Sequence, residues 1–134
     1  MANEWHEQRD LIAWFKAQWP EHTQAIRCSM NGLNLGGGRK ASIMVKQMQA
    51  QGMIKGEADL IFAVPRGAYG ALVLEHKAEG SPHKLTDLQT DYLKYHTSVG
   101  NCAVSTRGIA AAKAAIETYM KGKCYEIERE SSQG

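Results

Sequence analysis

Two carboxylates and one amine that could act on a single metal ion come from two short apolar segments. Asp59 lies within the first segment, residues 56–62, and Glu75 and Lys77 end the second, residues 72–77. Side chains alternate between the two faces of a strand, so Glu75 and Lys77 share one face while His76 points to the other. If the segments pair as strands, Asp59 lies beside Glu75. Converging carboxylates repel unless a cation lies between them, and their hard oxygens favour Mg²⁺ or Mn²⁺. The lysine could orient or activate a water.

The segments that would position these groups alternate between helix and strand. Turn residues over 65–70 predict that the two acidic segments form an antiparallel hairpin. Thr86 is predicted to be the N-cap of a later helix. Apolar spacing predicts helices over 4–19, 40–51, 87–97 and 107–121, and strands over 24–30, 56–62, 72–77 and 101–105. This order predicts an α/β fold with a mixed sheet flanked by helices. Trp5, Trp14 and Trp19 are expected in the core or an interface.

Length and composition favour one globular domain over residues 1–121, followed by a flexible polar tail over 122–134. No apolar run approaches the ~20 residues that span a bilayer, and no signal peptide is recognisable, so we expect a cytoplasmic protein without a membrane partner. The three cysteines, Cys28, Cys102 and Cys124, are odd in number and widely separated. We therefore expect all three to be reduced.

Charge alone is weak support for a nucleic-acid partner. The formal net charge is +2, but residues 25–125 carry 13 Lys or Arg against 7 Asp or Glu. That excess could follow a phosphate backbone, although a solvated surface of mixed charge is the preferred interpretation from charge alone. The glycines before Arg39 and Lys40 could grip phosphate or form a linker. They lack the Gly-Lys-Ser or Gly-Lys-Thr ending of a nucleotide-binding loop, so no nucleotide cofactor is expected.

Five elements in order resemble the virus-type replication-repair nuclease (VRR-NUC) branch of the PD-(D/E)XK nucleases. An N-terminal helix carries Glu4 and Gln8, and an Asn-Gly-rich loop runs from Asn31 to Arg39. A Gly-x-x-x-Gly-x-x-Asp segment follows and ends at Asp59. Glu-x-Lys matches residues 75–77, and a later glutamine matches Gln89. The resemblance covers about residues 4–120 and implies a restriction-endonuclease-like core.

The resemblance implies a metal-dependent DNA endonuclease that hydrolyses phosphodiester bonds. Asp59, Glu75 and the backbone carbonyl of His76 would hold one or two Mg²⁺ or Mn²⁺ ions, with Glu4 as a further ligand through water. Lys77 would position the attacking water, and Gln89 would hold Lys77 or a phosphate. Stand-alone members of the family are associated with homodimers that cut branched DNA such as four-way junctions. Candidate DNA contacts are Asn31, Arg39, Lys40 and Lys84.

Two departures from the family pattern and several alternatives stay open. Ala58 replaces a usual proline, and His76 replaces a usual apolar residue, for which packing or a hydrogen bond is expected. Either Glu4 or Glu7 could be the helix carboxylate, because one turn separates them. The alternatives are a catalytically weak DNA-binding accessory protein, a related nuclease acting on linear DNA, and a protein-interaction domain with surface ion pairs.

Overall fold

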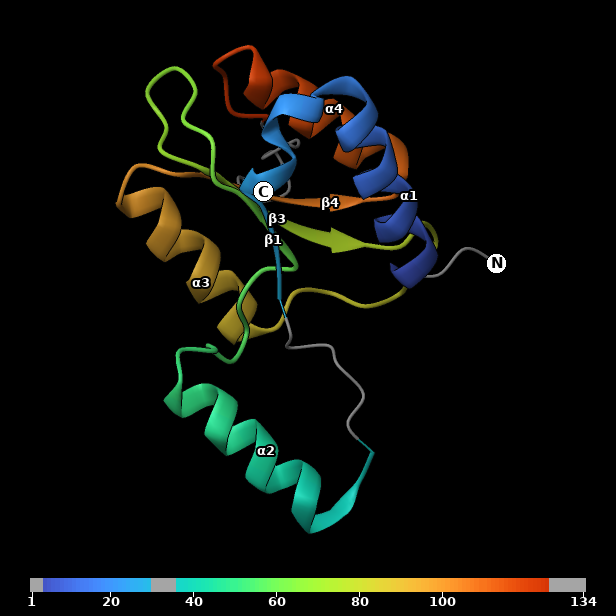
Figure 1. Cartoon of the computed structure of the whole chain (residues 1–134), viewed down its shortest axis with the longest axis vertical. Helices are drawn as coiled ribbons and strands as arrows, with labels where there is room; N and C mark the ends of the chain where they lie inside the picture. Colours follow the sequence, from blue (N-terminus) through green and yellow to red (C-terminus); the bar gives the residue numbers. More distant parts are fainter. Residues whose placement is uncertain (1–3, 30–35, 126–134) are drawn as a thin grey trace, which may run out of the picture.

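The computed structural model describes residues 4–29 and 36–125, which form a mixed α/β fold (Figure 1). The helices are α1 (Glu4–Gln18), α2 (Gly38–Ala50), α3 (Asp87–Ser98) and α4 (Ile109–Met120), and the short 3₁₀ helix η1 (Pro20–Ala25) follows α1. The strands are β1 (Ile26–Cys28), β2 (Leu60–Phe62), β3 (Leu72–Lys77) and β4 (Cys102–Arg107). The predicted alternation of helices and strands is confirmed, with η1 as an addition that the sequence pattern did not predict.

The four strands form one mixed sheet in the order β1-β2-β3-β4. The β1–β2 and β2–β3 pairs are antiparallel, and the β3–β4 pair is parallel. The predicted hairpin is therefore confirmed, with Arg66 and Tyr69 bridged in its turn. Parallel neighbours need a crossover connection, which here contains α3.

Helices cover both faces of the sheet. Helices α1 and α4 contact each other and one face, whereas α3 contacts β3 and β4 from the other face (Figure 1). All six residues of β3 are buried as a result, including its three polar residues. Most of the apolar core lies between the sheet and the α1/α4 layer, where Leu11, Phe15, Leu74 and Ile116 are fully buried. Strand β3 thus carries its polar end into the interior.

Helix α2 buries none of its residues, and neither does α3. Figure 1 shows α2 apart from the sheet and the three other helices. Ile43 and Met44 on this helix are 45% and 47% exposed. An amphipathic helix normally buries its apolar side chains against another element. In this chain α2 leaves them uncovered.

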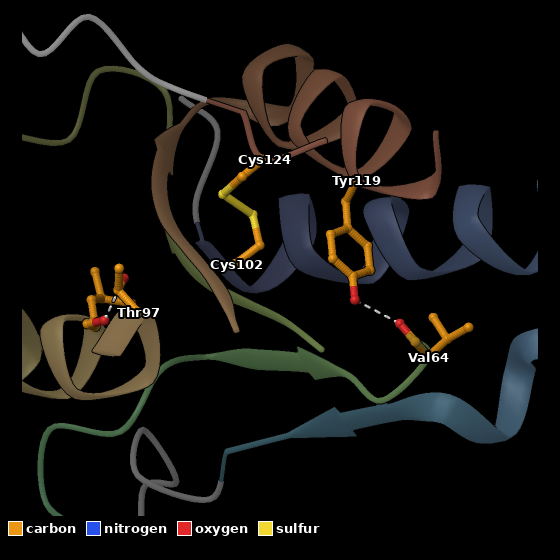
Figure 2. Close-up of a disulfide and its surroundings, with 6 residues drawn as sticks. Val64, Thr97, Cys102, Tyr119 and Cys124 are labelled. Atoms are coloured by element: carbon orange, nitrogen blue, oxygen red, sulfur yellow. Dashed lines mark hydrogen bonds between the residues drawn. A yellow bond between two sulfur atoms is a disulfide. The ribbon is translucent and has the colours of Figure 1, made fainter. Parts of the chain in front are cut away.

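The expectation of three reduced cysteines is wrong for two of them. Cys102 and Cys124 form a disulfide (Figure 2). Among the described residues only Cys28, which is exposed, is a free thiol. Helix α4 runs back along β4, so the residues after α4 return to the start of β4. Separation in sequence therefore did not imply separation in space. Cys124 and Tyr125, from the expected tail, pack against the core, and residues 126–134 lie outside the described residues.

Two further features complete the fold. Trp5 is 67% exposed, so its expected place in the core is wrong, whereas Trp14 and Trp19 pack against the core. The hydroxyl of Tyr119, buried under α4, donates a 2.7 Å hydrogen bond to the carbonyl of Val64 (Figure 2). No helix in the described ranges combines the length and the apolar character that a bilayer crossing requires.

Candidate metal-binding site at the end of strand β3

The antiparallel register brings the two predicted carboxylates together. Leu60 pairs with Leu74, so Asp59 and Glu75 are the next residues along the two strands. Oδ2 of Asp59 accepts a 2.7 Å hydrogen bond from the backbone N–H of His76. This bond fixes the Asp59 carboxylate against the end of β3. The expected convergence of the two acidic segments is thus present.

Glu75 is surrounded by polar groups but incompletely satisfied. Its Oε2 lies 3.5 Å from Nζ of Lys77 and accepts a 3.2 Å hydrogen bond from Nε2 of Gln89. Its Oε1 is buried and has no hydrogen-bond partner among the residues that the structure describes. A buried carboxylate oxygen without a partner is energetically unfavourable, because it has lost its hydrating water. This atom is therefore a candidate ligand atom.

Helix α3 brings Gln89 to Glu75 through a local capping arrangement. The hydroxyl of Thr86 accepts from the N–H of Gln89, and Oε1 of Gln89 accepts from the N–H of Thr86, which forms a capping box. The side-chain amide nitrogen remains free to donate to Glu75. From the sequence we expected Gln89 to hold Lys77 or a phosphate, but in the structure its amide donates to Glu75.

Gly56 allows α3 to approach the acidic segment closely. It adopts a φ of +86°, and a β-carbon at this position would lie 2.6 Å from Cβ of Leu88. Any side chain larger than hydrogen would push α3 away. This contact explains the glycine three residues before Asp59, and it helps to hold Gln89 at its distance from Glu75.

Burial and mutual repulsion perturb both carboxyl groups. Burial, followed by the negative charge of Asp59, raises the pKa of Glu75 to about 8. Burial also raises the pKa of Asp59, partly offset by the N–H of His76. Lys77 acts in the opposite direction on both groups but does not cancel the increase. A divalent cation would remove the cause of both shifts, since it stabilises the ionised forms.

The structure separates the positions of Glu4 and Glu7. Glu4, in the first turn of α1, is close enough for its charge to raise the pKa of Asp59. Glu7 lies one turn later and is buried against the other face of the sheet, where its Oε1 is 2.8 Å from Nε2 of His76. Glu4 is therefore the helix carboxylate on the side of the candidate site. The predicted hydrogen bond of His76 is present.

The candidate DNA-binding residues are not gathered around the carboxylates. Arg39 and Lys40 are exposed on α2, which lies apart from the sheet, and Lys84 is exposed in the loop between β3 and α3. Asn31 lies outside the described residues. Arg107 was not predicted as a functional residue, yet it holds the loop before α3 by donating to the carbonyls of Ser81 and His83. Nothing local in the sequence indicated that β4 ends beside this loop.

A hollow of about 690 Å³ lies between the end of α2, strands β1 and β2, and α3. Ala58, which precedes Asp59, and Ile61 contribute to its wall together with Arg27, Met48, Met53 and Tyr92. These residues come from β1, β2, α3 and the segment that ends α2. Asp59, Glu75 and Lys77 do not line this hollow.

The donor set suits a hard divalent cation only with help from the main chain. In the described ranges, no group of three His, Cys, Asp or Glu side chains is placed to hold a metal ion. The available set is therefore Asp59, the unpartnered oxygen of Glu75 and a backbone carbonyl such as that of His76. Oxygen atoms of this kind fit Mg²⁺ or Mn²⁺, which commonly keep several waters. Glu4 could act only through such a water.

The fold and the arrangement of these groups define a mixed α/β domain with two carboxylates and a lysine at the end of a central strand. The chain matches no protein-family model and no curated protein. Among solved structures it is similar to a "VRR_NUC domain protein", with a TM-score of 0.73 and 24% sequence identity over 94% of each chain. The resemblance found in the sequence is thus supported for the fold, which is VRR-NUC-like.

Proposed function

We propose that this protein is a divalent-metal-dependent DNA endonuclease that acts as a homodimer on branched DNA such as four-way junctions. The observation that carries the proposal is the pairing of half-buried Asp59 with buried Glu75, whose Oε1 has no hydrogen-bond partner in the described part of the chain and whose Oε2 lies beside Lys77. The similarity to a VRR_NUC domain protein supports a nuclease-type domain. Mg²⁺ or Mn²⁺ is the proposed cofactor.

The chain's own groups have separate tasks in the proposed reaction. Asp59, Glu75 and the carbonyl of His76 would hold the metal, whose chemistry is to lower the pKa of a bound water and neutralise charge on the phosphate. Lys77 is held by Glu75 at the same edge and would orient the attacking water. Gln89 keeps Glu75 in place. Water adds to phosphorus and one P–O bond of the strand breaks.

The surface of α2 supports the homodimer. This helix buries none of its residues and exposes Ile43 and Met44, so a second copy could cover its apolar side. A two-fold dimer would present two metal sites to one substrate, which suits the approximate two-fold symmetry of a four-way junction. Backbone and shape, rather than base sequence, would then guide recognition.

The central test combines metal binding with cleavage. Asp59→Asn keeps the size of the side chain and an oxygen that can accept from His76, but removes the negative charge. We expect it to abolish both Mn²⁺ binding by calorimetry and cleavage of a four-way junction. Glu117→Gln, on the exposed side of α4, is the matched control and should bind and cut like the wild type.

The substrate and the oligomer are tested in the same preparation. Linear duplex, single-stranded, flap and four-way-junction DNA should be compared with Mg²⁺ and with Mn²⁺, and the mass of the protein measured by light scattering. Fastest cleavage of the junction by a dimer supports the full proposal. Junction binding without cleavage by either metal would indicate an accessory protein, and cleavage by Asp59→Asn would remove the assigned site.

A further inference from the structure

The backbone of His76 belongs to the candidate metal site even though its side chain does not. Its N–H donates a 2.7 Å hydrogen bond to Oδ2 of Asp59, and its carbonyl is the main-chain ligand in the proposed metal set. A shift of the His76 backbone would therefore move two of the proposed ligands, the Asp59 carboxylate and the His76 carbonyl. Whatever fixes the His76 backbone also fixes the site.

The side chain of His76 is fixed from the opposite face of the sheet. It is fully buried, and its Nε2 donates a 2.8 Å hydrogen bond to Oε1 of Glu7 on α1. The second oxygen of Glu7 accepts a 3.1 Å hydrogen bond from the backbone N–H of Glu79. One buried carboxylate thus holds the chain at residues 76 and 79, on either side of Lys77.

Packing alone does not require this polar pair. Leu72 and Leu74 occupy the same face of β3 and bury apolar side chains against α1 and α4. Burial of an imidazole and a carboxylate carries a desolvation penalty that an apolar side chain at position 76 would avoid. The pair instead fixes an orientation. The two hydrogen bonds that Glu7 accepts restrict the rotation of the strand end more than apolar contact does.

We infer that Glu7 is a positioning residue for the metal site, acting through His76 from the far side of the sheet. This inference rests on the proposed function, since it assumes that a cation binds between Asp59 and the carbonyl of His76. Glu7 itself touches neither the cation nor the substrate. Glu7 instead sets the orientation of the His76 backbone, whose carbonyl would bind the cation.

The test replaces Glu7 by Gln, which preserves volume but leaves one acceptor oxygen for two donors. We expect the Mn²⁺ dissociation constant from calorimetry to rise about tenfold, within the range found when groups that orient metal ligands are altered. Hydrogen exchange at the amides of His76 and Glu79 should become faster. Cleavage should recover as Mn²⁺ is raised, because the catalytic groups remain intact.

A matched control separates positioning from simple loss of a buried hydrogen bond. Tyr119→Phe removes the buried bond to Val64 and should lower stability while leaving Mn²⁺ affinity and exchange at His76 unchanged. If Glu7→Gln does not fold, His76→Phe removes the same bond from the other side with a ring retained. It should weaken Mn²⁺ binding by a similar factor.

The outcomes distinguish this inference from the proposed function. Wild-type protein that binds no Mn²⁺ would overturn the proposed function and the inference with it. Wild-type protein that binds Mn²⁺, with the same affinity in Glu7→Gln and in Tyr119→Phe, would overturn the inference alone. Weaker binding in Glu7→Gln together with faster exchange at His76 supports it.

Discussion

The two faces of strand β3 bury acidic groups in opposite conditions. On the face covered by α1, both oxygens of Glu7 accept hydrogen bonds, one from the side chain of His76 and one from the backbone of Glu79. On the face toward α3, Glu75 has one bonded oxygen and one without a partner within residues 4–29 and 36–125, and Asp59 repels it. The first carboxylate is complete within the protein, and the second is not.

This difference indicates how a structural carboxylate can be told from a ligand-binding one. A buried acid that is fully hydrogen-bonded gains nothing from a cation, whereas a repelling pair with an unpartnered oxygen gains a great deal. Both kinds lie at the end of β3, on opposite faces of the sheet. The α3 face is therefore where a ligand is expected, and the α1 face is where that ligand's support is expected.

The largest expected effect comes from the lysine on the α3 face. Lys77→Met keeps the apolar stem and removes the ammonium group, so junction cleavage should fall by about 100-fold or more. Mn²⁺ affinity should persist or increase, because Lys77 is not a ligand and its positive charge opposes a cation. Single-turnover cleavage and calorimetry measure the two quantities. Lys94→Met, on the exposed side of α3, is the control. If Lys77→Met cleaves at the same rate as Lys94→Met, Lys77 has no part in the mechanism.

A smaller effect is expected in the pH dependence of stability without metal. The pKa of Glu75 rises from its usual 4.5 to about 8 in the folded protein, so over this interval the folded state binds more protons than the unfolded state. Stability must then fall as pH rises from about 5 to 8, by at most a few kcal/mol. Asp59, whose pKa is also raised, contributes with the same sign.

Urea unfolding with a chelator at several pH values between 5 and 8 measures this slope. Glu75→Gln should flatten most of it, and excess Mn²⁺ should reverse it in the wild type, because the cation replaces the proton. Glu117→Gln should keep the wild-type slope. Stability that rises with pH in the metal-free protein would mean that the α3 face does not hold an uncompensated acidic pair.

Local patterns were sufficient to predict the α3 face but not the α1 face. Alternation along residues 72–77 predicted the bounds of β3 and the shared face of Glu75 and Lys77, because side-chain direction in a strand repeats every two residues. The turn at 65–70 then predicted the pairing that brings Asp59 to Glu75. Both signals lie within twenty residues of one another.

The remaining contacts depend on how distant elements pack. Glu7 and His76 meet across 69 residues, and no periodicity in either segment encodes the orientation of α1 on the sheet. The Cys102–Cys124 disulfide was missed for the same reason. Trp5 was likewise expected in the core or an interface, but it is exposed at the start of α1.

The smallest expected effect concerns Thr106, which pairs with His76 in the parallel register of β3 and β4. Its Oγ1 and Nδ1 of His76 are both buried without hydrogen-bond partners among the described residues. Thr106→Val keeps the shape and removes a buried hydroxyl that gains nothing, so stability should stay constant or rise by up to about 1 kcal/mol. Mn²⁺ affinity and cleavage should change less than about twofold.

Thermal unfolding and calorimetry of Thr106→Val sharpen the comparison between the faces. A loss of more than about 1 kcal/mol would mean that the hydroxyl donates to Nδ1 of His76 in solution. The α1 face would then carry a continuous polar chain from Glu7 through His76 to Thr106, anchoring β4 as well as β3. In that case Thr106→Val should also weaken Mn²⁺ binding, since the His76 backbone would lose one of its two side-chain restraints.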